Sequence, residues 1–367
     1  MRKTIFITGS TGLLGSYLLS KLSYGNPYEN TEVVALTRGR TQKDAERRLL
    51  ETLRKIPHSK SARRSSLTVV RGDIAKRRLG LSKKAYDDLS RRVSSIYHSA
   101  ALAEFSIPLP IIRRINVGGT RNILEFALLC QKNGDFKGVH YISTVAVAGS
   151  KNSTFYENQL DLGQKFNNTY EKTKFEAEKL VTRYRNKGLP IAVYRPSIIV
   201  GDSKTGYTNN LKMFYQPLHL FSLGLFKEIP ADKKTVYSFV PADYTADAIV
   251  RIASASDIAK NSTYHIANPN MVRLDYVVDT ASKYFGFQKP RFIRDRESCV
   301  KKFSELQRSL LDPFIPYFYY KKRFDTTNSE SILKRSGFKW PNVNKLFLNR
   351  LYKFCIKCGF IKPKRRK

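Results

Sequence analysis

The sequence predicts an α/β protein with a doubly wound parallel sheet and a smaller C-terminal substrate lobe. Two observations lead to this prediction. Short apolar runs alternate with helix-period segments through the first 200 residues, as in parallel sheets that carry helices on both faces. The alternation ends after Val200, and the remaining chain mixes loops rich in Gly, Pro and Asn with aromatic segments. We therefore predict a first domain of residues 1–200 and a second of 201–367, with 238–268 returning to the first.

The expected elements follow from the period of the apolar residues. Most strand candidates are short and continuously apolar, which is typical of strands buried on both faces. The strands are expected at residues 4–8, 32–37, 67–71, 94–98, 138–143 and 190–195, with a late strand at 263–267. The helices between them are expected at residues 13–22, 43–54, 85–92, 110–130 and 170–186.

Composition places the chain among globular proteins of a reducing compartment. Of its 367 residues 41% are hydrophobic, too many for a disordered polymer. No apolar run approaches the ~18 residues that cross a bilayer. The N-terminus enters a strand rather than a cleavable signal, and four cysteines do not make a disulfide scaffold. We expect a cytoplasmic protein, with peripheral attachment to a membrane as an open alternative.

Positive charge dominates the composition, with 66 Lys and Arg against 30 Asp and Glu, a net +36. Such an excess attracts nucleic acid, anionic lipid, or a phosphorylated or acidic substrate. A general lysine bias explains it equally well, because the charge is spread along the chain. Nucleic acid is not expected, since no helix-turn-helix, zinc or RNA-binding signature accompanies the charge.

A glycine-rich turn follows the first strand and opens the first helix. Gly9, Gly12 and Gly15 have the spacing that allows a tight turn, close approach of the backbone to a pyrophosphate, and close strand–helix contact. The preceding strand and the following helix supply the context that this motif requires. We therefore predict a dinucleotide site whose turn also includes Thr11, Leu13 and Leu14.

The ends of the second and third strands indicate which dinucleotide binds. NAD-preferring sites place an acidic residue after the second strand, whereas this chain has Arg38 and Arg40, which suit a 2′-phosphate. We predict NADPH over NADH, with Arg38 as the main discriminator. Asp73, followed by Ile74, comes after the third strand, where a carboxylate can bind an adenine amino group.

Catalytic chemistry is indicated by Tyr170 and Lys174, which lie one helical turn apart and so share a face. A neighbouring ammonium stabilises a phenolate, so we expect the pKa of Tyr170 to fall from ~10 toward neutrality. Such a tyrosine exchanges a proton with a carbonyl oxygen while hydride arrives at carbon. Thr144, or with less support Ser143, ends the fifth strand and is expected to bind the same oxygen.

The combined motifs resemble the extended short-chain dehydrogenase/reductase superfamily, which has a Rossmann fold. The likeness covers nearly the whole chain and is greatest to the branch of fatty acyl-CoA reductases and carrier-linked thioester reductases. The segments that resemble this branch are GDIAKRRLGLS (72–82), HSAA (98–101), NVGGT (116–120), YRPSIIVGDSKTG (194–206), FVPAD (239–243), HIANP (265–269) and FDTTN (324–328).

The resemblance implies roles for particular residues. Thr144, Tyr170 and Lys174 would be the catalytic triad, and the first domain would bind NADP. Besides the residues named above, Ala100, Ala101 and Lys174 would touch the cofactor, with Pro196 and Ser197 near the nicotinamide. The implied activity is NADPH-dependent reduction of acyl thioesters, acyl-CoA or carrier-bound acyl, to an aldehyde. Acyl-CoA or an acidic acyl carrier protein would be supplied in trans.

Two other kinds of function remain open at this stage. The same triad serves sugar-nucleotide epimerases or dehydratases and oxidoreductases of ketones or hydroxy compounds. A non-enzymatic NADP-sensing module is less favoured, because the chain keeps all three catalytic residue types. The aromatic segments 211–226 and 303–320 are expected to form either an acyl pocket or ordinary core.

The C-terminal segment carries two further features. From residue 331 to the end there are twelve basic and no acidic residues, and apolar residues recur at helical spacing over 343–360. This stripe is expected to cap the second lobe, with contact to an anionic membrane as the alternative. Cys355 and Cys358 have the spacing of half a zinc site but lack a second pair, so we expect packed thiols and no metal.

Overall fold

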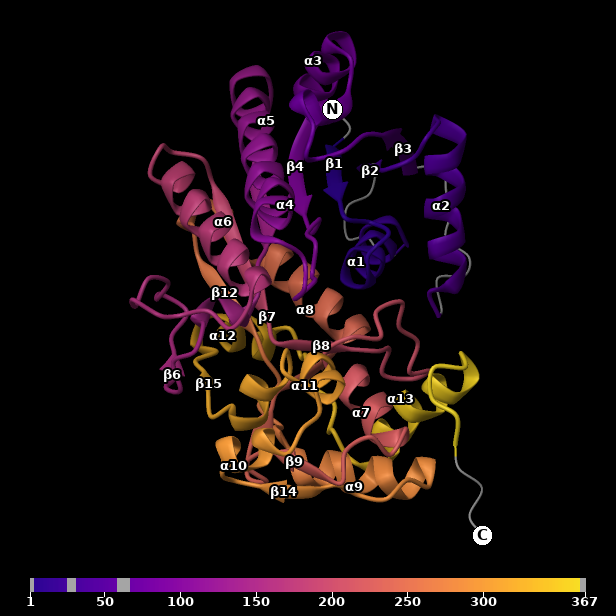
Figure 1. Ribbon diagram of the computed structural model, residues 1–367. Coiled ribbons are helices and arrows are strands. Elements are labelled where there is room, and N and C mark those ends of the chain that lie inside the picture. Colours follow the sequence, from indigo (N-terminus) through magenta and orange to yellow (C-terminus); the bar gives the residue numbers. More distant parts are fainter. Residues whose placement is uncertain (1–2, 25–30, 58–66, 364–367) are drawn as a thin grey trace.

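The computed structural model describes residues 3–24, 31–57 and 67–363. A seven-stranded parallel sheet forms the centre of the larger part of the molecule (Figure 1). Its strand order is β12-β7-β5-β4-β1-β2-β3. The strands are β1 (Lys3–Thr8), β2 (Thr31–Thr37), β3 (Leu67–Arg71), β4 (Val93–His98), β5 (Gly138–Ile142), β7 (Ile191–Pro196) and β12 (Thr263–Ile266). Every neighbouring pair is parallel, so the carboxyl ends of the strands share one edge. The predicted α/β class and the predicted strands are confirmed.

Successive residues along each strand point to opposite faces of the sheet. Apolar residues therefore lie on both faces, and helices cover each of them. On β1, Ile5 and Ile7 face one apolar cluster and Phe6 faces the other. The first cluster is covered by α1 (Leu13–Tyr24), α2 (Gln42–Lys55), α8 (Ala242–Ala255) and α12 (Thr327–Arg335). The second is covered by α3 (Lys83–Arg92), α5 (Gly119–Asn133) and α6 (Thr169–Arg185).

The helix expected at 110–130 is interrupted. It consists of α4 (Leu109–Arg113), a π-helical turn (Arg114–Gly118) and α5. Asn116 in this turn accepts from the Leu102 amide at 2.7 Å and donates to the Leu102 carbonyl at 3.1 Å and the Thr173 hydroxyl at 3.1 Å. The π-helical turn therefore places the buried Asn116 side chain where it hydrogen-bonds both to the loop after β4 and to helix α6.

The smaller C-terminal region has an apolar core of its own, which lies below the sheet in Figure 1. Its helices are α7 (Tyr215–Ser222), α9 (Leu274–Phe285), α10 (Arg296–Lys301), α11 (Glu305–Leu311) and α13 (Lys345–Lys357). Paired short strands complete the fold: β6 (Thr154–Phe155) with β15 (Arg323–Phe324), β8 (Ile198–Val200) with β11 (Phe239–Pro241), β9 (Glu228–Pro230) with β14 (Arg291–Ile293), and β10 (Val236–Tyr237) with β13 (Val272–Arg273).

The apolar stripe near the C-terminus belongs to this core. Leu351 and Cys355 of α13 are fully buried, and the Tyr352 hydroxyl donates to the carbonyl of Val277 on α9 at 3.0 Å. The structure therefore favours the capping interpretation over a stripe that lies on a membrane. Within the described ranges, no helix is long and apolar enough to span a bilayer.

Candidate active site

The predicted site residues meet at the carboxyl edge of the sheet. Gly9 follows β1, Arg38 follows β2, Asp73 follows β3, Ala100 follows β4 and Thr144 follows β5. Pro196 ends β7, and the Thr144 hydroxyl donates to its carbonyl at 3.4 Å. The order of the strands reverses between β1 and β4, and open α/β sheets bind ligands at such a point.

The glycine turn forms an open cradle at the N-terminus of α1. Gly9 has φ +77°, and a Cβ there would lie 2.5 Å from the Ala100 nitrogen, so the ends of β1 and β4 touch directly. A Cβ on Gly15 would lie 2.0 Å from the Gly9 carbonyl oxygen, which brings α1 against the turn. Gly12 is exposed. This uncovered helix start with no side chain at its centre fits a dinucleotide pyrophosphate.

The remaining residues predicted to contact the cofactor lie around this cradle. The side chains of Leu13 and Leu14 are buried in the core, so only their backbone can face a ligand. Arg38 is exposed, and its carbonyl accepts from the Arg48 guanidinium at 2.7 Å. The others also lie near this edge: Thr11 in the turn, Asp73 and Ile74 after β3, Ala100 and Ala101 after β4, and Ser197 after β7. The Ser197 hydroxyl donates to the Ser238 carbonyl at 2.7 Å.

Helix α6 positions Tyr170 and Lys174. Asn168 caps its N-terminus by accepting from the Glu171 amide at 2.9 Å, which fixes the first turn that carries Tyr170. Lys174, one turn later, is buried and donates to the Tyr141 hydroxyl at 3.0 Å and the Ile142 carbonyl at 2.9 Å. The ammonium is thus held by the last residues of β5.

The direction of the pKa shift of Tyr170 differs from the expectation. Burial raises the pKa of Tyr170 to about 12, and a hydrogen bond with Thr144 opposes that rise. Burial also lowers the pKa of Lys174 to about 8, while the charge of Glu178 opposes the fall. The expected fall at Tyr170 was wrong because burial of the phenol disfavours its charged form, and the Lys174 ammonium hydrogen-bonds to Tyr141 and Ile142. Tyr170 is therefore protonated at neutral pH.

A buried polar network, which sequence reasoning did not assign, lies behind these residues. Tyr141 hydrogen-bonds with Thr120 as well as Lys174. Thr120 lies 3.2 Å from His98 Nε2, and His98 Nδ1 lies 2.7 Å from the Thr8 hydroxyl. Burial lowers the pKa of His98 to about 3, so its imidazole is neutral. The sequence signal for this network was a phenol near the carboxyl end of a short strand that also carries His140.

A buried ion pair lies one turn beyond Lys174. Glu178 accepts from the Arg195 guanidinium, Nε at 2.9 Å, and from the Ser143 hydroxyl. Both charged side chains are almost inaccessible to solvent, at 2% and 3% exposure. Ser143, the less favoured candidate for substrate contact, is therefore engaged away from Thr144 and Tyr170. Thr144 and Tyr170 can donate hydrogen bonds to a substrate oxygen, and the Lys174 ammonium is held in place one helical turn from Tyr170.

Comparisons with known proteins agree with this architecture. A linear gramicidin synthase of Brevibacillus parabrevis is 28% identical over 79% of this chain, and aldehyde reductase lnaA of Aspergillus flavus is 30% identical over 72%. The chain spans only 6% and 26% of those two proteins. The terminal R domain of the myxalamid PKS-NRPS pathway superposes with a TM-score of 0.83 at 27% identity, covering 99% of this chain and 92% of that domain.

The family model described as male sterility protein matches residues 7–249, which is more than half of the chain. That span contains the glycine turn and the end of β5, which lie at one edge of the sheet, and helix α6 with Tyr170 and Lys174. The chain therefore belongs to the male sterility family of extended short-chain dehydrogenases/reductases, a family of NAD(P)-dependent reductases related to thioester reductase domains.

Proposed function

We propose that this protein is an NADPH-dependent reductase that converts acyl thioesters, either acyl-CoA or carrier-bound acyl groups, to aldehydes. The observation that carries the proposal is that Thr144, Tyr170 and Lys174 gather at the carboxyl end of β5, at the same edge of the sheet as the glycine cradle that follows β1. The names of its relatives support the reaction class, since they include an aldehyde reductase and an L-2-aminoadipate reductase.

The chain's own part in the reaction is to hold and protonate the substrate oxygen. With a pKa of about 12, Tyr170 keeps its proton at neutral pH and donates a hydrogen bond to the thioester carbonyl together with Thr144. The Lys174 ammonium supplies positive charge near the developing oxyanion. NADPH, when bound, supplies the hydride. Release of the thiol from the resulting hemithioacetal leaves the aldehyde.

Single-turnover oxidation of NADPH with an acyl-CoA tests this function. Tyr170→Phe removes the proposed donor and is expected to lower the rate by roughly 10²- to 10⁴-fold. Tyr194→Phe is the matched control, because Tyr194 is buried on β7 and its hydroxyl lies 2.9 Å from His140 Nδ1. Equal rates for wild type and Tyr170→Phe would refute the proposal.

The preference for NADPH is proposed from Arg38. It is exposed at the end of β2, where Arg40 follows and no carboxylate occupies the position that binds a ribose hydroxyl in NAD enzymes. Arg38→Ala is expected to raise KM for NADPH at least tenfold and leave KM for NADH nearly unchanged. Steady-state kinetics with both cofactors measures this. Arg91→Ala, an exposed residue of α3, is the control.

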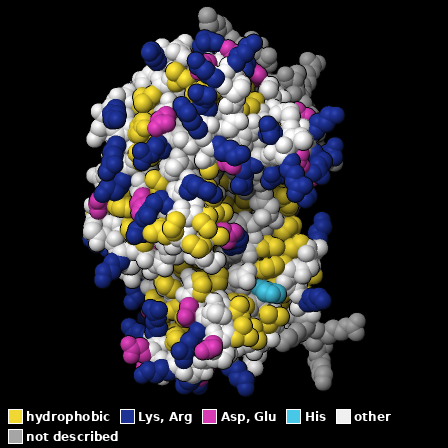
Figure 2. Space-filling model, turned by 45° about the horizontal axis from the view of Figure 1, so that its top comes forward, with side chains coloured by type: hydrophobic (Ala, Val, Ile, Leu, Met, Phe, Trp, Pro, Cys, Tyr) yellow, Lys and Arg dark blue, Asp and Glu magenta, His cyan; other side chains and the backbone are white. Residues whose placement is uncertain are grey.

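Positive charge suits either form of the substrate. Lys and Arg side chains are spread over the face shown in Figure 2, whereas hydrophobic side chains gather near its middle. Coenzyme A carries phosphates, and acyl carrier proteins are usually acidic, so both would be attracted to such a surface. We propose that the acyl group reaches the site on one of these carriers.

A further inference from the structure

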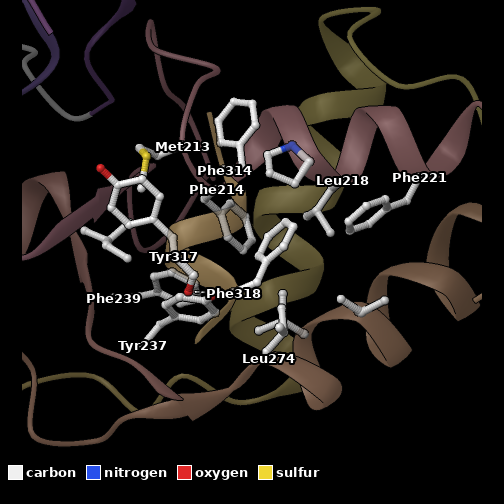
Figure 3. A pocket seen from close by; sticks show the side chains of 14 residues that line it. Met213, Phe214, Leu218, Phe221, Tyr237, Phe239, Leu274, Phe314, Tyr317 and Phe318 are labelled. Atoms are coloured by element: carbon white, nitrogen blue, oxygen red, sulfur yellow. Dashed lines mark hydrogen bonds between the residues drawn. The ribbon is translucent and has the colours of Figure 1, made fainter. Parts of the chain in front are cut away.

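The core of the C-terminal region contains an apolar cavity of about 50 Å³ (Figure 3). Met213 and Phe314 on its wall are partly exposed, whereas Phe221 and Val278 on its wall are almost completely buried. The cavity is thus bounded by accessible side chains and by the interior of the lobe. Its walls include residues of the two aromatic segments that were expected to form either an acyl pocket or core, together with residues of β8, β10, β11 and α9.

Two chains of contact connect this cavity to the proposed catalytic residues. Ile198 lines it and lies two residues after Pro196, whose carbonyl accepts from the Thr144 hydroxyl. Tyr317 also lines it, and its ring stacks on Phe105 with centroids 5.8 Å apart. The Phe105 ring lies 6.3 Å from that of Tyr170. Short chains of contact therefore link the cavity to both Thr144 and Tyr170.

The side chains that line the cavity offer no free hydrogen-bond donor. Its only hydroxyls belong to Tyr237 and Tyr317. The Tyr317 hydroxyl donates to Glu171 at 2.6 Å, and the Tyr237 hydroxyl donates to the Tyr317 carbonyl at 3.0 Å. The other lining side chains are apolar, including the Met213 thioether. A polar group entering the cavity would lose its hydrogen bonds to water and would meet no free hydrogen-bond donor among these side chains.

We propose that this cavity binds the hydrocarbon part of the acyl substrate and selects against acyl groups that carry a hydroxyl or amino group there. This inference rests on the proposed function and narrows its substrate to aliphatic thioesters. Binding of a hydrocarbon here is favourable because it removes apolar surface from water. A polar substituent that loses its hydrogen bonds to water makes binding less favourable. A volume of about 50 Å³ accommodates only a few methylene groups, so the cavity binds a short end of the chain.

The first test compares two substrates that differ by one hydroxyl. NADPH oxidation is measured with octanoyl-CoA and with 8-hydroxyoctanoyl-CoA. We expect kcat/KM for the hydroxylated substrate to be roughly 10- to 100-fold lower, because its hydroxyl oxygen would be buried without a hydrogen-bond donor. Equal kcat/KM values for the two substrates would overturn the inference while leaving the reductase function in place.

The second test fills the cavity. Val278→Phe adds volume to its wall and is expected to lower kcat/KM for octanoyl-CoA at least tenfold while leaving acetyl-CoA unaffected. Leu223→Phe is the control, since Leu223 is 53% exposed at the end of α7. If Val278→Phe does not fold by circular dichroism, Met213→Trp at the partly exposed wall takes its place. An equal decrease in kcat/KM for octanoyl-CoA and acetyl-CoA would contradict selection of the acyl chain by this cavity.

A binding measurement separates this inference from the proposed function. Saturation-transfer NMR with 1-octanol and 1,8-octanediol needs no turnover, and we expect transfer to 1-octanol that Val278→Phe or Met213→Trp abolishes. Absence of thioester reduction together with selective octanol binding would refute the function but retain the hydrocarbon site. Equal transfer to the diol, or transfer unchanged in these variants, would refute the hydrocarbon site.

Discussion

At the scale of single residues, the fixed ammonium of Lys174 is the main feature. An ammonium has three N–H donors, and two of them are taken by the Tyr141 hydroxyl and the Ile142 carbonyl. One donor is left for a ligand. Tyr141 also lies under the ammonium, with its ring centroid 4.6 Å from Nζ. Tyr141 thus positions the charge that the proposed mechanism uses.

We predict that Tyr141→Phe moves the alkaline limb of the rate profile to lower pH. Burial already lowers the pKa of Lys174 to about 8, so its charge is present below that pH and lost above it. Loss of a hydrogen-bond acceptor disfavours the ammonium further and is expected to shift the limb down by about one pH unit. The measurement is kcat/KM for NADPH between pH 6 and 10. Tyr194→Phe should keep the wild-type profile, and an unshifted Tyr141→Phe profile would contradict the role.

Sequence reasoning was sufficient for some of these residues and insufficient for others. Gly9, Tyr170 and Lys174 belong to local patterns, in which spacing along a turn or a helix sets the geometry. The pairing of Tyr141 with Lys174 joins residues 33 positions apart on different elements. No local pattern contains that contact. The burial that raises the pKa of Tyr170 likewise depends on residues from distant segments, so the direction of that shift was predicted wrongly.

At the scale of elements, a buried ion pair joins α6 to β7. Arg195 of β7 contacts Glu178 of α6, the backbone of the segment that includes Gln159, and His265 of β12. The guanidinium also lies over the Phe155 ring, 4.8 Å from its centroid. Because Glu178 and Lys174 share a helix, this pair also fixes the rotation of the proposed catalytic helix relative to the sheet.

We predict that Arg195→Leu destabilises the fold by about 3–5 kcal/mol, because Glu178 would remain buried without its partner. Urea denaturation followed by circular dichroism measures the free energy of unfolding. Arg113→Leu is the matched control: its pair with Glu176 also anchors α6 but is 44% and 26% exposed, so its loss should cost about 1 kcal/mol or less. A double variant Glu178→Leu/Arg195→Leu should lose less than the two single variants together.

The elements themselves were predicted unequally. The parallel strands and their helices have clear apolar periods, and the observed bounds differ from the predicted ones by a few residues. The π-helical turn at Arg114–Gly118 was not predicted, since its apolar period runs on through it. The short strand pairs of the C-terminal region depend on contacts between distant segments, so apart from the helical spacing over 343–360 only the aromatic composition of this region was informative.

At the scale of the whole molecule, α13 closes the core of the C-terminal region from the far end of the chain. Phe347, Leu348, Leu351, Tyr352 and Cys355 are all at most 2% exposed. Tyr352 stacks parallel to Phe214, a residue of the cavity wall, with centroids 6.3 Å apart. The helix therefore supports the proposed hydrocarbon site as well as the lobe around it.

We predict that deletion of residues 344–367 abolishes soluble folding. Burial of each large apolar side chain contributes about 1.5–3 kcal/mol. The combined loss of Phe347, Leu348, Leu351 and Tyr352 is therefore comparable with the ~5–15 kcal/mol that stabilises a typical domain. The soluble fraction and the thermal unfolding transition are measured beside a control that lacks only residues 362–367, which should fold like the wild type. Co-sedimentation of the full chain with phosphatidylserine vesicles gives the opposing test. A folded, soluble truncation that no longer binds such vesicles would show that α13 serves a membrane surface instead of the core.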